Sequence, residues 1–77
     1  MPYEWEFGER VREARWRAGL TQDKLARAVG VTQNVVSYWE SGHKMPGLLN
    51  IYKLTQALNV SADYLVLGEE EACEQKS

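Results

Sequence analysis

Four side chains between positions 33 and 38 share one chemistry: Gln33, Asn34, Ser37 and Tyr38 are uncharged and can all form hydrogen bonds. At about 100° per residue of a helix, the last three lie on one face, with Gln33 in the exposed first turn. Exposed helix faces usually carry Lys and Glu, because Asn and Ser disfavour helix interiors. Amide groups can form paired hydrogen bonds with adenine edges, and hydroxyl groups can bond a base or a phosphate. A solvated polar surface is the competing interpretation, but the composition of this face favours recognition.

Two short helices, joined by a break at Val29-Gly30-Val31, must position these side chains. Three segments share one helix-start pattern, in which an apolar residue and a hydroxyl cap precede a second apolar residue four positions beyond the cap. The three sets are Leu20-Thr21 with Leu25, Val31-Thr32 with Val36, and Val60-Ser61 with Leu65. They predict helices at about 22–29, 33–41 and 62–67.

Two further helices follow from apolar spacing. The first buries one stripe and ends at Gly19, while the second lies between Pro46-Gly47 and Asn59, at about 48–58. Their apolar positions are Phe7, Val11, Ala14 and Ala18, and Leu48, Ile51, Leu54 and Leu58. No alternating pattern of β-branched residues predicts a sheet. We therefore expect an all-α fold of five helices, with an N-terminal extension at 1–6, a domain at 7–67 and an acidic, disordered tail at 68–77.

Composition excludes several classes of protein. The chain of 77 residues predicts one domain, and with a single Cys73 and a single histidine it offers no internal disulfide and no metal site. No apolar run approaches the roughly 20 residues of a membrane span, and no secretion signal is present, so we expect a cytoplasmic protein without a membrane partner. No cluster of acids, bases or nucleophiles indicates an enzyme, and no cofactor is expected.

The net charge of the chain is −2, but its charges are unevenly distributed. From Phe7 to Lys53 the chain carries eight basic residues against four acidic ones, whereas most other acidic residues lie in the tail. A positive body is compatible with binding to phosphates, although such an excess also occurs on ordinary surfaces.

Three strings, GLTQDKLA, GVTQNVVSYWESGHKMP and YKLTQALNVSADYL, carry a family resemblance. In this order and spacing they closely resemble the helix-turn-helix domain of the phage Cro and C1 repressors and their XRE-type relatives. The resemblance covers Phe7 to Gly68. It implies a compact five-helix, lambda-repressor-like bundle whose third helix lies in the major groove of DNA.

The resemblance also implies roles for individual residues. Base-reading positions are Gln33, Asn34, Val35, Ser37 and Tyr38. Phosphate-binding positions are Gln22, Thr32, His43 and Lys44, although for His43 the exposed loop residue is the favoured interpretation. Arg15 and Glu40 are expected to form an ion pair that ties the first helix to the recognition helix.

From the resemblance and the residues together, we expect a transcriptional repressor that binds an inverted-repeat DNA operator as a homodimer. The candidate dimer interface is Tyr64, Leu65, Val66 and Leu67, with packing onto the first helix as the competing role for these side chains. A protein-interaction module, such as an antitoxin or an adaptor, is the alternative function. Trp5, Trp16 and the acidic tail favour that alternative.

Overall fold

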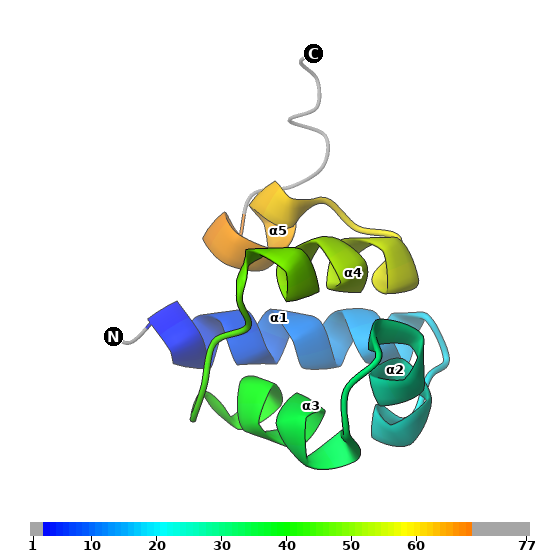
Figure 1. The fold of residues 1–77 in the computed structure, drawn as a ribbon. Coiled ribbons are helices and arrows are strands. Elements are labelled where there is room, and N and C mark those ends of the chain that lie inside the picture. The colour runs from blue at the N-terminus through cyan, green and yellow to red at the C-terminus, as the bar shows by residue number, and fades with distance from the viewer. Residues whose placement is uncertain (1–2, 69–77) are drawn as a thin grey trace.

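The computed structural model describes residues 3–68, with side chains from residue 6 onward, and contains five α-helices within this range. They are α1 (Tyr3–Arg17), α2 (Gln22–Val29), α3 (Gln33–Ser41), α4 (Leu48–Leu58) and α5 (Ala62–Leu67). No strand occurs in the described residues, so the predicted all-α fold is confirmed. The bounds of α2 to α5 agree with the predicted ranges. In Figure 1, α1 crosses the middle of the molecule, with α3 on one side and α4 and α5 on the other.

Hydroxyl caps account for the starts of two helices. Thr21 Oγ1 accepts a hydrogen bond from the backbone N–H of Lys24 at 3.1 Å, and Ser61 Oγ accepts one from Tyr64 at 3.0 Å. Each satisfies a first-turn N–H that has no partner within its helix. The prediction was wrong for Thr32, whose backbone has the extended cap conformation but whose hydroxyl makes no capping bond.

The turn between α2 and α3 depends on Gly30. Its φ of 90° is left-handed, and its N–H donates to the carbonyl of Ala26 at 2.8 Å. A residue with a Cβ adopts this conformation only at a cost, so glycine allows α2 to stop and α3 to leave at a new angle. This turn fixes α3 relative to α2.

The bounds of α1 differ from those that the apolar stripe suggested. The helix begins at Tyr3, inside the segment expected to be an extension, and ends at Arg17, so Ala18 lies in the following turn and is exposed. An apolar stripe marks only the part of a helix that packs on the core, and α1 continues beyond that part. The tail from residue 69 and the side chain of Trp5 lie outside the described residues.

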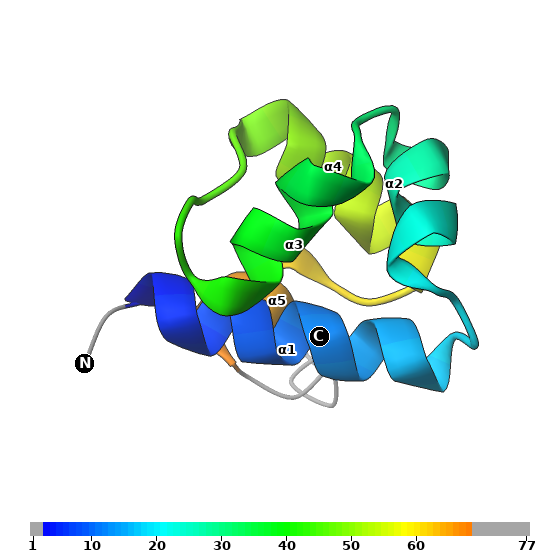
Figure 2. The ribbon, with the colours of Figure 1, turned by 90° about the horizontal axis from the view of Figure 1, so that it is seen from below.

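All five helices contribute to one core, in which α1 packs against both α3 and α5, and α2 packs against α3 and α4. Its buried apolar residues are Phe7, Val11, Ala14, Leu25, Ala26, Val29, Val36, Trp39, Leu54, Leu58 and Leu65. Close approach of α1 to the end of α3 requires Gly8, because a Cβ there would lie 2.5 Å from the carbonyl oxygen of Glu40 and closer still to that of Trp39. Figure 2 shows the end of α3 against α1.

Arg10 on α1 forms two hydrogen bonds to the short α5. Its Nε donates to the carbonyl of Leu65 at 2.9 Å, and its Nη2 donates to that of Val66 at 3.0 Å. A cation at a helix C-terminus satisfies free carbonyls and interacts favourably with the helix dipole. The contact holds the last described helix in place. Among residues 3–68, no helix is long and apolar enough to cross a membrane.

Candidate nucleic-acid interface

The outward side of α3 carries the predicted base-reading residues. Gln33 and Asn34 are exposed, Tyr38 is 45% exposed, and Ser37 is half-buried. Val35 is also half-buried and packs against the core, so less of it is available to a ligand. The opposite side of α3 is buried through Val36, Trp39 and Glu40. The helix therefore separates a row of polar groups from the side that anchors it.

Glu40 is the buried charge beneath this row, with 2% of the residue exposed. The ion pair expected with Arg15 is present: Arg15 Nε donates to Oε2 at 2.6 Å, and Nη2 donates to Oε1 at 3.2 Å. Arg15 Nη1 also donates to the carbonyl of Leu20 at 3.0 Å, and Arg12 Nε lies 3.7 Å from Glu40 Oε1. Two planar groups in paired contact fix each other's orientation, so the pair joins α1 to α3 in a defined geometry.

Gln22 connects this ion pair to the exposed row. Its Nε2 donates to Glu40 Oε1 at 3.1 Å, while its Oε1 accepts from Gln33 Nε2 at 3.3 Å. The sequence analysis assigned Gln22 to a phosphate and missed this internal bridge. A buried carboxylate needs several donors, and that requirement is the signal that could have identified Gln22 as one of them. One N–H of its amide remains available for a ligand.

The amide of Gln33 is oriented by the same bridge. One of its two N–H groups donates to Gln22, which leaves its carbonyl oxygen and its second N–H. An acceptor and a donor side by side match the N6 and N7 positions of adenine in the major groove. Asn34 and Ser37 form no side-chain hydrogen bond with the other described residues. The row thus presents unused hydrogen-bonding groups.

The start of α3 suits an anion. The backbone N–H of Val35 donates to the carbonyl of Thr32 at 3.1 Å, whereas those of Gln33 and Asn34 have no partner within the helix and the exposed hydroxyl of Thr32 does not cap them. Such a helix end attracts negative groups through its N–H groups and through the helix dipole. No acidic residue occupies this first turn.

A hollow of about 330 Å³ lies at the other end of α3 and is lined by Tyr38, His43 and Lys44. The His43 ring lies 6.0 Å from that of Tyr38, and its Nδ1 lies 2.7 Å from Ser41 Oγ. Contact with Ser41 and Tyr38 restrains the imidazole, so His43 is not simply a free loop side chain. The ammonium group of Lys44 is exposed beside it.

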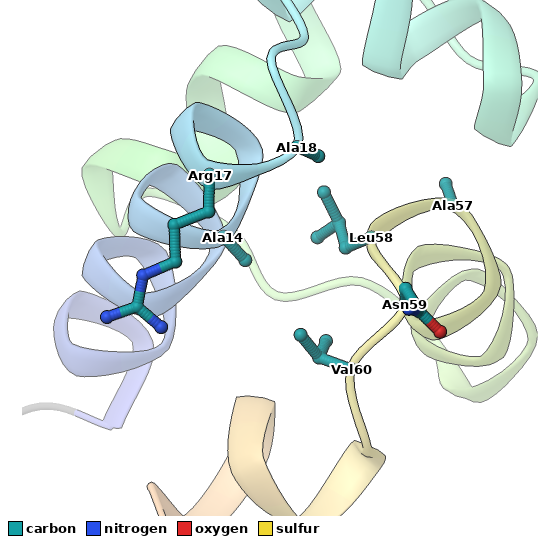
Figure 3. A pocket seen from close by; sticks show the side chains of 7 residues that line it. All are labelled: Ala14, Arg17, Ala18, Ala57, Leu58, Asn59 and Val60. Atoms are coloured by element: carbon teal, nitrogen blue, oxygen red, sulfur yellow. The ribbon is translucent and has the colours of Figure 1, made fainter.

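A second hollow, of about 370 Å³, lies between the end of α1 and the turn that joins α4 to α5 (Figure 3). It is lined by Ala14, Arg17, Ala18, Ala57, Leu58, Asn59 and Val60. None of the predicted DNA-contacting residues lines it, and its one charged side chain, Arg17, pairs with Glu13 at 2.8 Å. The row of polar side chains on α3 and this hollow are separate features.

The four residues of the candidate dimer interface do not form one exposed surface. Leu65 is completely buried within the domain, so that part of the prediction was wrong. Tyr64 and Val66 are half-buried against the core, and only Leu67 is largely exposed, at 62%. Because α5 packs against α1, its inward-facing residue Leu65 is buried in the core of its own chain.

Comparison with known proteins places this geometry in a family. The family model described as "Helix-turn-helix" matches residues 11–65. The HTH-type transcriptional regulator ImmR of Bacillus subtilis is 38% identical over 65 residues, which are 84% of this chain and 50% of ImmR. Repressor protein C2 of Salmonella phage P22 is 37% identical over 63 residues, which are 82% of this chain and 29% of the repressor. The chain therefore spans half the length of these curated relatives or less.

The crystal structure of the P22 c2 repressor protein in complex with synthetic operator 9T has the same fold. It matches with a TM-score of 0.79 and 36% sequence identity, covering 82% of this chain and 96% of that one. Both sequence and fold thus agree with the resemblance in the three strings. The chain belongs to the Cro/C1-type helix-turn-helix family of DNA-binding transcription regulators, which are not enzymes.

Proposed function

We propose that this chain is a cytoplasmic transcriptional repressor that binds an inverted-repeat operator as a homodimer, with α3 of each copy in the major groove. The exposed row of uncharged hydrogen-bonding groups on α3, with the amide of Gln33 oriented by Gln22, is the observation that carries this proposal. In the helix-turn-helix arrangement, the second helix of the motif presents its N-terminal residues to base edges. A dimer places two such helices about 34 Å apart, one turn of DNA.

Separate groups would read bases and hold the backbone. Gln33, Asn34, Ser37 and Tyr38 supply donors and acceptors for base edges, with Val35 available at the margin for a thymine methyl group. Backbone phosphates would meet the polar groups at the two ends of the motif, which are Gln22 and Thr32 at the helix starts and His43 and Lys44 in the loop. Phosphate contacts set the register, and base contacts set the sequence preference.

The proposal is tested by selecting bound sequences from a random duplex pool and measuring affinity for the selected site by fluorescence anisotropy. Affinity should fall steeply between about 50 and 200 mM salt, because phosphate contacts release counterions. Weak, salt-independent binding would contradict the proposal. It would favour the protein-interaction role instead, for which Trp16, 64% exposed, is a candidate contact.

Two substitutions separate the roles of the side chains. Gln33→Ala should cost about 1 to 3 kcal/mol on the selected site and relax the preference at one base pair. Lys44→Ala should weaken binding to all sequences alike and reduce the salt slope by about 1. Lys53→Ala is the matched control, because Lys53 is an exposed lysine on α4, outside the two helices of the motif. Equal effects of Gln33→Ala on selected and mismatched sites would refute the base-reading role.

A further inference from the structure

His43, in the loop after α3, is held by one ring nitrogen and leaves the other open. Its Nδ1 lies 2.7 Å from Ser41 Oγ, and its ring centroid lies 6.0 Å from that of Tyr38. Nε2 forms no hydrogen bond with the other described residues. The side chain is exposed and lines the hollow of about 330 Å³ together with Tyr38 and Lys44. The second nitrogen of a restrained imidazole is therefore available to a ligand at this end of α3.

The hydrogen bonds of Ser41 identify which nitrogen carries the proton of the neutral ring. A serine hydroxyl has one hydrogen to donate, and its oxygen can also accept. Ser41 Oγ donates this hydrogen to the carbonyl of Tyr38 at 3.2 Å, so in the contact with His43 the hydroxyl oxygen accepts and Nδ1 donates. A neutral imidazole has a single N–H, which leaves a lone pair on Nε2. Uptake of a second proton therefore occurs at Nε2, the open nitrogen.

Protonation of Nε2 changes what this end of α3 offers to a phosphate. The neutral ring presents an acceptor, which forms no hydrogen bond with an anionic phosphate oxygen because that oxygen is also an acceptor. The cationic ring presents an N–H donor and a positive charge, and hydrogen bonds between charged partners are shorter and stronger than neutral ones. Nδ1 can donate to Ser41 in both states. The ring can thus change its role without changing its position.

The charged surroundings of His43 couple its proton to an anionic ligand. Tyr38 and Lys44 are the titratable groups that share its hollow. No carboxylate with a described side chain forms an ion pair with His43. The acids of α1 to α3 that form ion pairs do so with arginines, and they are Glu9, Glu13, Asp23 and Glu40. A DNA phosphate would supply a counter-charge to both the imidazolium and the ammonium group of Lys44. Because such coupling is reciprocal, proton uptake and phosphate binding strengthen each other.

We propose that His43 binds a backbone phosphate only in its protonated form, so that DNA binding takes up about one proton per chain. This inference rests on the DNA-binding function proposed above and specifies how that function responds to pH. Histidine changes its charge between about pH 5 and 8, and His43 is the single histidine of the chain. Phosphates are common to all DNA sequences, so a fall in pH within this range strengthens binding to every sequence alike.

Anisotropy titrations of the selected duplex at about pH 5.5 and about pH 8, each over about 50 to 200 mM salt, measure the coupling. Affinity of the wild type should rise by roughly tenfold at the lower pH for each His43 that contacts DNA, as expected for one added charge-assisted hydrogen bond. The salt slope should steepen by about 0.9 for each such contact. Circular dichroism at the two pH values should be the same, because the proton is taken up at an exposed group.

Two substitutions at position 43 are the matched controls. His43→Gln is uncharged throughout this pH range, so it should lose the gain in affinity at the lower pH and the steeper salt slope. His43→Lys is cationic throughout, so its salt slope should be the same at both pH values and close to that of the wild type at about pH 5.5. Both variants should fold, because His43 is exposed. Any pH dependence that remains in His43→Gln belongs to other groups of the chain.

Nitrogen NMR shifts of the neutral imidazole test the hydrogen-bond assignment separately. A proton on Nδ1 is expected, and a proton on Nε2 would overturn the proposal, because the open nitrogen would then donate at every pH. An equal gain in affinity at the lower pH for the wild type and His43→Gln, or a salt slope that does not change with pH, would also overturn it. Both of these results would leave the DNA-binding function intact. Absence of binding to the duplex at either pH and low salt would overturn the proposed function, and this inference with it.

Discussion

Replacing Glu40 by alanine should destabilise the domain more than any surface substitution. The carboxylate is 2% exposed and accepts two hydrogen bonds from Arg15 and one from Gln22. Its removal leaves the guanidinium of Arg15, 9% exposed, without a counter-charge. Breaking a buried pair in this way costs about 3 to 5 kcal/mol. The entire stability of a 77-residue domain is about 4 to 12 kcal/mol at 0.05 to 0.15 kcal/mol per residue.

Thermal and urea unfolding, followed by circular dichroism, measure this loss. For a domain of this size, 1 kcal/mol corresponds to about 4 to 8 °C in Tm, so a loss of about 3 kcal/mol lowers Tm by about 12 to 24 °C. Glu13→Ala is the matched control, since Glu13 forms an exposed ion pair with Arg17, and its loss should cost no more than about 0.5 kcal/mol.

A second substitution identifies the cause of the loss. Adding Arg15→Met to Glu40→Ala removes the stranded charge, so part of the stability should return. If the loss came only from the space left by the carboxylate, the second substitution would increase it. If the Tm of Glu40→Ala were as close to that of the wild type as the Tm of Glu13→Ala, the reasoning would be refuted.

Three further substitutions test features of the fold by the same unfolding measurements. Gly8→Ala should lower stability by about 1 to 3 kcal/mol, because the clash with α3 outweighs the gain of about 1 kcal/mol in helix propensity. Gly47→Ala, whose Cβ meets open space, should cost less, because it loses only the preference for Gly over Ala at the N-cap of α4. Thr21→Ala should cost about 1 kcal/mol through loss of its cap, whereas an equal loss for Thr32→Ala would contradict the difference between the two hydroxyls. Arg10→Gln should speed hydrogen exchange of the α5 amides more than that of the α2 amides, because α5 loses its two hydrogen bonds to Arg10. An equal increase in the two helices would show that Arg10 does not hold α5 in place.

The bounds of α2 to α5 could be predicted because their signals are local. The side chain of Thr21 and the left-handed backbone of Asn59, with φ of 58°, act within one helical turn of their own positions. The apolar stripe of α1 likewise predicted the burial of Phe7, Val11 and Ala14. Such features need no knowledge of how the helices pack.

Features that join distant segments could not be predicted in the same way. Gln22 was expected to face a ligand, but 18 positions further along the chain Glu40 takes up one of its N–H groups. The burial of Leu65 follows from the position of α5 on α1, which Arg10 helps to fix from 55 residues away. Gly8 belongs to no sequence motif, and only the packing of α3 against it explains why a glycine is needed there. The family resemblance supplied the pairing of Arg15 with Glu40, which residue spacing alone does not show.

The hydrogen bonds of Gln22 separate the polar side chains on the outward side of α3 into those that can change freely during evolution and one that cannot. Asn34 and Ser37 make no side-chain hydrogen bond within the described domain, so substitutions at these positions should not lower the stability of the fold. Gln33 is different, because its partner Gln22 also serves the buried Glu40. A new residue at position 33 would require a compatible partner at position 22. We therefore expect these two positions to vary together among natural relatives, while Asn34 and Ser37 vary independently.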